Sequence, residues 1–234
     1  MKFSRYAIYY APPPKAEWAR FATGWLGWDM QAGQGAGHPH LPDLPMPLAD
    51  ITRSPRKYGL HATLKPPFRL ADGMSQDNLE TACADLCRTL GPLTLEPLRL
   101  TRLGRFLALC PPASLGLSEL AAACVRDLDR LRAPPSQAEL DRRRAANLTS
   151  RQEANLIAWG YPHVLEDFRF HVTLTGRLAK PDLSAVQKVL QRNLTPLLPT
   201  SFTVSDLALT GEDADGRFHL VRRFQLSGCH ASPV

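Results

Sequence analysis

Two stretches of the sequence share one pattern: residues 61–64 are His-Ala-Thr-Leu, and residues 171–174 are His-Val-Thr-Leu. Both tetrads lie in runs of β-branched and apolar residues that predict strands. Alternate side chains of a strand point to the same face, so the histidine and threonine of each tetrad project together. Each strand is therefore expected to turn an imidazole and a hydroxyl to one face and apolar side chains to the other. The four polar residues are His61, Thr63, His171 and Thr173.

The surroundings of the tetrads repeat as well. Each predicted strand is followed by an amphipathic helix and then by two more strands. After the first tetrad these elements are expected near residues 75–90, 93–100 and 105–110, and after the second near residues 182–194, 201–210 and 217–225. The same order at nearly the same spacing indicates a two-fold internal repeat. Pro66 and Pro67 are expected to end the first of these strands.

The repeat predicts how 234 residues are organised. A chain of this length allows one large domain or two small lobes. We expect a single bilobal domain, with lobe one at about 12–112, lobe two at about 160–234, and a strand within 1–11 joining one of the sheets. Residues of about 115–159 show helical patterns throughout and are interpreted as a helical insertion. Neither lobe holds both tetrads, so the two lobes should share one cleft.

Composition and charge narrow the class of protein. The chain has 28 Lys and Arg against 22 Asp and Glu, a net charge of +6, which suits an anionic small ligand or a weak nucleic-acid surface. No window of 18 apolar residues occurs, and the N-terminus lacks the apolar region of a signal peptide. We therefore expect a cytoplasmic protein with no membrane partner. The sequence leaves the oligomeric state open.

Cysteine and histidine spacing gives little sign of a metal site. The cysteines are odd in number and form no Cys-x-x-Cys pair, so they are interpreted as reduced, mostly buried thiols. They are Cys83, Cys87, Cys110, Cys124 and Cys229. His38 and His40 lie in a Gly- and Pro-rich loop and are interpreted as solvated. Neither tetrad supplies further ligands at metal spacing, so no metal and no cofactor is expected.

Two imidazoles and two hydroxyls suit the cleavage of a phosphodiester without a metal. One neutral histidine can take a proton from the attacking group while the other, protonated, gives a proton to the leaving oxygen. Imidazoles titrate near pH 6.5, so both forms are accessible at neutral pH. The threonine hydroxyls can bind the non-bridging phosphate oxygens. The alternative is that both histidines are hydrogen-bonded core residues. The sequence does not show which histidine is the base.

The duplicated His-x-Thr-Leu on strands resembles the 2H phosphoesterase superfamily, which includes LigT-like and cyclic-phosphodiesterase-like proteins. Longer stretches resemble the 2H-like proteins encoded with bacterial phosphonate-utilisation genes. These stretches are residues 56–68, residues 148–152 with 159–162, and residues 168–176. The resemblance implies an α+β fold with two pseudo-symmetric lobes, an antiparallel sheet and flanking helices in each, and an active-site cleft between them. It also implies that His61, Thr63, His171 and Thr173 are catalytic.

The phosphonate context of that resemblance implies hydrolysis of a small cyclic phosphate, such as a phosphoribosyl cyclic phosphate. One alternative is an enzyme of RNA ends, either a 2′,3′-cyclic phosphodiesterase or a 2′–5′ ligase, which the charge permits but does not favour. Another alternative is a non-catalytic module that binds nucleotides or phosphonates. The intact pair of tetrads argues against a pure binder, which needs no matched acid and base.

Five further residues are candidates for substrate binding. Lys65 continues the alternation that begins at His61, and Arg169 shares the predicted face of His171. Arg5 and Tyr9 fall on one face of the first strand, and Arg5 is the candidate anion ligand there. Two tyrosines near the tetrads are candidates to stack on a substrate; they are Tyr58 and Tyr161. The run Arg142–Arg144 would reach the ligand only if the inserted helices cover the cleft.

Overall fold

The computed structural model describes residues 2–228 and contains one sheet of seven strands. Every neighbouring pair in this sheet is antiparallel, and the order is β11-β10-β1-β4-β8-β7-β6. The strands are β1 Arg5–Tyr10, β4 Ala62–Phe68, β6 Arg99–Leu103, β7 Phe106–Cys110, β8 Val172–Thr173, β10 Asp206–Glu212 and β11 Phe218–Gln225. Two small pairs, β2 Trp28–Asp29 with β3 Gln34–Gly35 and β5 Leu93–Leu95 with β9 Phe202–Val204, complete the strands of the described chain.

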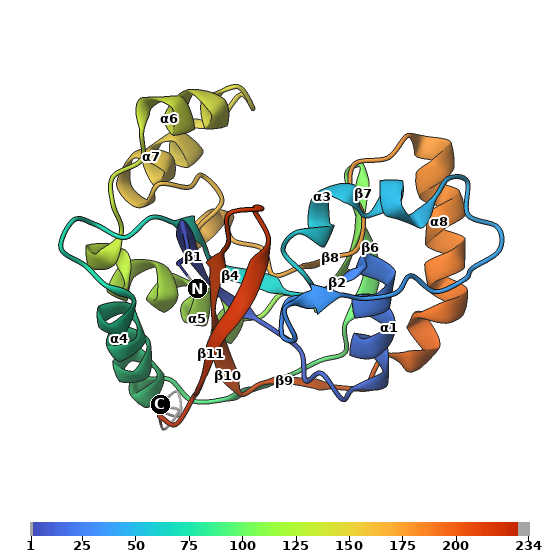
Figure 1. The fold of residues 1–234 in the computed structure, drawn as a ribbon, viewed down its shortest axis with the longest axis horizontal. Coiled ribbons are helices and arrows are strands. Elements are labelled where there is room, and N and C mark those ends of the chain that lie inside the picture. The colour runs from blue at the N-terminus through green and yellow to red at the C-terminus, as the bar shows by residue number, and fades with distance from the viewer. Residues whose placement is uncertain (1, 229–234) are drawn as a thin grey trace.

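Helices lie around this sheet (Figure 1). The longer ones are α1 Glu17–Leu26, α4 Gln76–Thr89, α5 Leu115–Asp127, α6 Gln137–Arg144, α7 Ser150–Trp159 and α8 Lys180–Asn193. Two single turns, α2 Leu48–Ile51 and α3 Arg53–Arg56, precede the first tetrad. The predicted α+β class with antiparallel strands and flanking helices is therefore confirmed. Within the described residues, no helix is long and apolar enough to cross a membrane.

The two copies of the repeat exchange their hairpins. The first tetrad strand, β4, and its helix α4 share a lobe with the hairpin β10–β11 from the second copy. The second tetrad strand, β8, and its helix α8 lie with the hairpin β6–β7 from the first copy (Figure 1). The two connections that carry the hairpins across pair with each other as β5 and β9. The expected lobe boundaries at about 12–112 and 160–234 are thus wrong, because each lobe combines segments of both copies.

The expected insertion at about 115–159 consists of two different parts. Helix α5 packs on β4 and contributes Leu117, Leu120 and Cys124 to the core, so it belongs to the lobe itself. Helix α6 buries none of its side chains, and α7 buries only Asn155 and Leu156. In Figure 1, α6 and α7 stand together beyond the edge of the lobe. Only these two helices form a peripheral addition.

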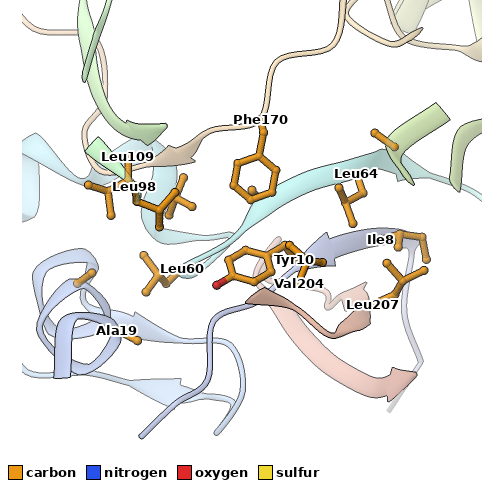
Figure 2. Packing of buried hydrophobic residues seen from close by; sticks show 14 of the residues in the cluster. Ile8, Tyr10, Ala19, Leu60, Leu64, Leu98, Leu109, Phe170, Val204 and Leu207 are labelled. Carbon is orange, nitrogen blue, oxygen red and sulfur yellow. The ribbon is translucent and has the colours of Figure 1, made fainter. Parts of the chain in front are cut away.

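One continuous apolar cluster runs beneath the centre of the sheet and through both lobes (Figure 2). It includes Leu60 and Leu64 beside the first tetrad and Phe170 and Leu174 beside the second, all at most 5% exposed. The alternation predicted from the sequence is therefore confirmed for both tetrads. Burying such side chains contributes roughly 1.5–3 kcal/mol each, which anchors the polar residues between them.

The strand β4 continues through Pro66 and Pro67 to Phe68, so the expected end at these prolines is wrong. Its pairing with β8 is confined to Ala62, and beyond that point only the edge facing β1 is paired. A proline has no backbone N–H to offer to a ladder, but it is tolerated on an unpaired edge or at a bulge. The register with β1 also shifts between Thr63 and Phe68.

The four cysteines within the described residues are free and buried, as predicted; Cys229 lies outside those residues. Burial raises the pKa of the Cys83 and Cys87 thiols to about 12, so both remain protonated at neutral pH. These thiols therefore act as packing groups rather than as nucleophiles.

Candidate active site

The sheet register brings the two tetrads together at its centre. Ala62 of β4 is paired with Val172 of β8, and the strands are antiparallel. This pairing sets each histidine opposite the threonine of the other tetrad: His61 opposite Thr173, and His171 opposite Thr63. All four side chains therefore project from one face, with the histidines as diagonal neighbours at a Cα separation of roughly 7–8 Å. The predicted convergence of these four residues is confirmed at the level of backbone register.

Two adjoining cavities open over this face. The tetrad cavity, of about 230 Å³, is lined by His61, Thr63 and Thr173. The side cavity, of about 550 Å³, is lined by His171 and again by Thr63. Within the described residues, no hydrogen bond occupies the hydroxyl of either threonine. Both hydroxyls are therefore free to donate to an anion placed between the histidines.

Both imidazoles are held by the same local hydrogen bond. Nδ1 of His61 lies 3.0 Å from the carbonyl oxygen of Gly59, and Nδ1 of His171 lies 2.7 Å from that of Arg169. A carbonyl can only accept, so Nδ1 carries the proton in each ring. Nε2 is then the atom that exchanges a proton in both histidines. Gly59 adopts a φ of +70°, and a Cβ there would come within 2.8 Å of Met30, so glycine is required at this turn.

The environment lowers the pKa of both histidines. Burial lowers the pKa of His61 to about 4, while the hydrogen bond to Gly59 opposes this effect and the charge of His171 adds to it. Burial also lowers the pKa of His171, and the charge of Arg169 lowers it further. Both imidazoles are consequently neutral in the free protein at neutral pH. The pKa of His61 is the more strongly lowered of the two, because its imidazole is more deeply buried.

An aromatic group covers His61. The ring of Tyr9 lies 4.0 Å from the imidazole centroid, and the ring of Tyr58 lies 5.8 Å away. Phe218 supports both tyrosines from β11. Tyr9 is fully buried, which raises the pKa of its hydroxyl well above the ordinary value. Sequence alternation places Tyr9 on the same face as Arg5, but nothing in the sequence marks it as the neighbour of His61.

Replacing Tyr9 by alanine should therefore raise the pKa of His61 from about 4 toward 6.5, because water would reach the imidazole. The control is Tyr9→Phe, which keeps the ring and should leave the pKa of His61 low. An NMR titration of the histidine ring protons measures both, with the His61 signal assigned by its loss in His61→Ala. An unchanged pKa in a folded Tyr9→Ala variant would show that the ring does not cause the shift.

Arg5 lines the tetrad cavity, as expected, but its charge is already paired. Its guanidinium donates two hydrogen bonds of 2.5 Å to Glu212 of β10. Burial alone would raise the pKa of Glu212, but the hydrogen bonds from Arg5 and from Ser4 lower it below its ordinary value. Arg5 is thus mainly a structural partner of Glu212 that forms one wall of the cavity.

Three other candidates lie where the sequence placed them. Tyr58 lines the tetrad cavity, and Tyr161 lines both cavities. Arg169 is exposed and lines the side cavity together with His171. A fourth residue, Arg143 from α6, also lines the tetrad cavity, so the inserted helices do reach the cleft. No sequence signal distinguishes Arg143 from its neighbours in the arginine run.

Lys65 does not lie in the site, contrary to expectation. Thr63 is opposite Tyr9 on β1, but Lys65 is opposite Ile8, so a bulge between them moves Lys65 to the opposite face. Its side chain is 2% exposed, and Nζ donates to the carbonyl of Val125 at 2.9 Å and to Asp129 at 3.3 Å. Lys65 therefore binds the C-terminal end of α5, where a cation is favourable.

We expect Lys65→Met to lower the free energy of unfolding by about 2 kcal/mol, the value of a charged hydrogen bond at a helix end. Asp129 keeps its pairing with Arg132, so no carboxylate is left alone. Urea denaturation measures the stability, and KM for a cyclic phosphate should change by less than about twofold. A large rise in KM without a loss of stability would return Lys65 to the substrate site.

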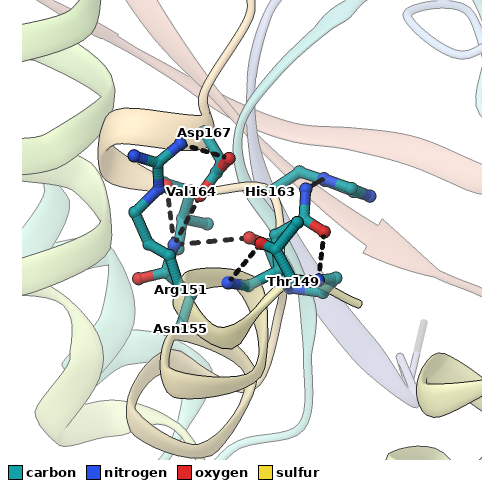
Figure 3. Close-up of polar contacts among 8 residues, drawn as sticks. Thr149, Arg151, Asn155, His163, Val164 and Asp167 are labelled. Atoms are coloured by element: carbon teal, nitrogen blue, oxygen red, sulfur yellow. Dashed lines mark hydrogen bonds and ion pairs between the residues drawn. The ribbon is translucent and has the colours of Figure 1, made fainter. Parts of the chain in front are cut away.

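A polar network fixes the wall that carries Tyr161 (Figure 3). Arg151 of α7 donates two hydrogen bonds to Asp167, at 2.8 and 3.0 Å. Asn155 is buried and donates to the carbonyls of Pro162 and Val164. These bonds bind the segment between α7 and β8 to the face of α7. The side chains of that segment are therefore held against the cavity by contacts that do not involve the tetrads.

Potential metal ligands are not clustered in the described chain: no group of three or more His, Cys, Asp or Glu side chains is placed to hold an ion. The two imidazoles are side chains of the site that can exchange a proton near neutral pH. The chemistry that the geometry offers is therefore proton transfer by two histidines on either side of an anion held by two hydroxyls.

Residues 63–219, about two thirds of the chain, match the family described as protein of unknown function, DUF1045. The chain belongs to the DUF1045 family. The matched region of this DUF1045 protein begins at Thr63 and includes all of the second tetrad. It also includes the inserted helices α6 and α7, so they are part of the matched region.

Two curated proteins are similar to this DUF1045 chain, and both are named ribose 1,5-bisphosphate phosphokinase PhnN. The protein of Janthinobacterium sp. (strain Marseille) is 37% identical over 185 residues, which is 78% of this chain and 41% of the relative. The protein of Laribacter hongkongensis (strain HLHK9) is 37% identical over 183 residues, 76% of this chain and 42% of the relative. The chain thus spans about two fifths of the length of these relatives.

Solved structures are also similar. The structure of TT0787 of Thermus thermophilus is 15% identical with a TM-score of 0.48 and covers 97% of this chain and 100% of its own. The structure of E. coli LigT complexed with NADP+ is 17% identical with a TM-score of 0.46 and covers 97% of this chain and 99% of its own.

Proposed function

We propose that the protein is a phosphodiesterase that opens a small cyclic phosphate by paired-histidine acid–base catalysis. The observation that carries this proposal is the register Ala62 with Val172, which sets an imidazole and a hydroxyl on each side of one cleft. Both Nδ1 atoms are bound to backbone carbonyls, which leaves two Nε2 atoms for proton transfer. A site that only binds phosphate has no need of two matched imidazoles held in this way.

The reaction follows from these positions. The cyclic phosphate lies between the histidines, and the hydroxyls of Thr63 and Thr173 donate to its non-bridging oxygens. Nε2 of one histidine takes a proton from a water molecule as that water attacks phosphorus. The bond from phosphorus to one sugar oxygen breaks in line with the attack, and the other histidine gives its Nε2 proton to this oxygen. The product is a phosphate monoester.

The environments of the two histidines support an assignment of the two roles. The base must be neutral, and His61, whose pKa is lowered to about 4 mainly by burial, is neutral over the working range. The acid must be protonated, and a bound anion favours the protonated form of His171, which lines the larger of the two cavities. We therefore assign His61 as the general base and His171 as the general acid for hydrolysis.

The names of the curated relatives support a substrate class. Ribose 1,5-bisphosphate is the sugar phosphate in those names, and the chain matches about two fifths of each relative. Opening a 5-phosphoribosyl 1,2-cyclic phosphate at the bond between phosphorus and O2 yields ribose 1,5-bisphosphate. This hydrolysis would therefore produce the compound that the named kinase uses. The proposed leaving group is then the O2 atom of the ribose, protonated by His171.

Phosphorus NMR tests the proposal directly. The purified protein is incubated in EDTA with each of three substrates in turn. They are 5-phosphoribosyl 1,2-cyclic phosphate, ribosyl 1,2-cyclic phosphate without the 5-phosphate, and an oligonucleotide ending in a 2′,3′-cyclic phosphate. We expect the cyclic phosphate signal of the ribosyl compounds to be replaced by a new monoester signal with the native protein and to persist with His61→Ala. Faster opening of the oligonucleotide would favour an RNA-end enzyme. Identical spectra for both proteins on every substrate would reject the phosphodiesterase proposal.

A further inference from the structure

The inserted helix α6 places one arginine against the tetrad cavity. Arg143 is half-buried, whereas its neighbours Arg142 and Arg144 are exposed. Its guanidinium carbon lies 4.4 Å from the centroid of the Tyr161 ring, and both residues line the same cavity as His61. Stacking on an aromatic ring holds a guanidinium in one plane while leaving its N–H groups free to bind.

The charge of Arg143 is not neutralised by the described part of the protein. Within the described residues it makes no ion pair, whereas Arg144 binds Glu153 and Arg5 binds Glu212. No carboxylate of residues 2–228 lines the tetrad cavity. Of the two arginines that line the tetrad cavity in the described part of the chain, Arg143 is therefore the one whose charge has no anionic partner.

The positive surface continues away from the tetrads. A second, narrow depression, which we call the basic groove, shares Arg5 and Arg143 with the tetrad cavity. Its remaining charged lining residues are Arg69, Arg132, Arg142 and Glu139. An anionic group at the boundary between the two depressions would contact Arg143. The same substrate molecule could then place a second phosphate between the tetrads.

Polar contacts at both ends hold α6 in place. Ser136 caps its first turn, and Glu139 binds Arg69 at the end of β4 at 3.0 Å. At the other end, Arg144 binds Glu153 of α7 at 2.6 Å. Because α6 buries no side chain, apolar packing does not account for its position. What this arrangement does achieve is to present Arg143 to the cavity.

We propose that Arg143, stacked on Tyr161, binds a second anionic group of the substrate, a phosphate monoester on the same sugar that carries the cyclic phosphate. This inference rests on the proposed function and adds a specificity-determining residue to it. A guanidinium binds a phosphate through two parallel hydrogen bonds, which fixes both the position and the orientation of the group. The enzyme would then prefer a phosphorylated cyclic sugar phosphate over the unphosphorylated one.

The kinetic test compares 5-phosphoribosyl 1,2-cyclic phosphate with the same compound lacking the 5-phosphate. The native protein should prefer the first in kcat/KM, and Arg143→Ala should reduce this preference at least tenfold, mainly through KM. Arg143→Lys, which keeps the charge but loses the paired hydrogen bonds, should fall between the two. The control is Arg177→Ala, an exposed arginine that lines neither the tetrad cavity nor the basic groove, and it should alter the preference less than threefold. An equal loss on both substrates in Arg143→Ala would overturn the proposal.

A binding measurement separates this proposal from the proposed function. Isothermal titration with ribose 5-phosphate should give at least a tenfold weaker Kd for Arg143→Ala than for the native protein, while His61→Ala should bind like the native protein. If ribose 5-phosphate binding depends on Arg143 but no cyclic phosphate is opened, the subsite stands and the phosphodiesterase proposal fails. If binding is the same with and without Arg143, the subsite is rejected whatever the turnover.

Discussion

Replacing His61 or His171 by alanine should lower kcat on a cyclic phosphate by about 10³-fold, within the range that a positioned acid or base contributes. In the proposed mechanism each histidine carries the proton on its own side of the cleft, and the residue directly opposite it is a threonine. The remaining tetrad cannot replace the missing function, since its own imidazole is already used. Phosphorus NMR or a coupled phosphate assay at saturating substrate measures the loss.

The threonines provide the comparison within the same site. Thr63→Val and Thr173→Val remove one hydroxyl each and keep the shape of the side chain, so we expect losses of roughly 10- to 100-fold. The double variant His61→Ala/His171→Ala should be little worse than either single variant, because residues that act as a unit are not additive. His38→Ala, in the exposed loop, controls for the loss of a histidine as such.

One outcome would contradict the paired-histidine mechanism, and a second would show only that the variants are unfolded. If one histidine variant kept more than about a tenth of the native kcat, that residue would not transfer a proton in the limiting step. If both variants lost activity together with their thermal transition, the loss would report unfolding. The cores beneath the tetrads consist of Leu64, Phe170 and their neighbours, which these substitutions leave in place. We therefore expect unchanged circular dichroism and a Tm within a few degrees of the native value.

The sequence was sufficient to predict the geometry of the candidate site because the deciding pattern is local. Alternation along a strand sets His61 and Thr63 on one face, and a repeat sets a matching pair in the second copy. The apolar residues between them show which face is buried. These inferences need no knowledge of distant contacts, and the structure confirms them for all four tetrad residues.

Other features depend on pairings that alternation does not contain. Lys65 lies outside the site because a bulge against β1 shifts the alternation of the strand by one residue. The neighbouring Pro66 and Pro67 are compatible with a bulge, but from the sequence they were interpreted as the end of the strand. The exchange of hairpins between the copies is decided by which edge of the sheet each hairpin joins. Arg143 lies at the cavity because the ion pairs of Arg144 and Arg69 hold helix α6 in place, and the Arg69 pair joins residues distant in the sequence. Such long-range contacts are what the structure adds.

The second large expected effect is an acidic optimum of kcat/KM, which reports the protonation of the free enzyme. The proposed general base, His61, is neutral above a pH of about 4, since burial lowers its pKa to that value. The proposed general acid, His171, is protonated only below its own pKa, which burial and the charge of Arg169 hold below the ordinary 6.5. The productive state, with His61 neutral and His171 charged, is therefore most populated between these limits. Above them, kcat/KM should fall about tenfold for each pH unit.

The assay uses ribosyl 1,2-cyclic phosphate without the 5-phosphate, because a phosphate monoester itself titrates near pH 6. Both histidines have lowered pKa values in the folded state, so below pH 6.5 the unfolded chain binds protons that the native chain does not. The free energy of unfolding therefore decreases as the pH falls. Samples held at each pH and then assayed at one common pH separate such unfolding from true titration of the site.

Arg169 allows the assignment of the falling limb to be checked at its source. Burial is the main effect that lowers the pKa of His171, and the charge of Arg169 lowers it further, while the hydrogen bond to the Arg169 carbonyl raises it. Arg169→Gln should therefore raise the pKa of His171 and move the falling limb of kcat/KM to higher pH. Arg177→Gln removes the same charge from an exposed arginine beyond the second tetrad, and it should leave the falling limb where it is.

In the substrate complex the bound anion favours protonated His171, so the optimum of kcat should lie at higher pH than that of kcat/KM. A kcat/KM that rises to a plateau above pH 8 would show that no imidazolium donates the proton, and the leaving oxygen would then need another acid.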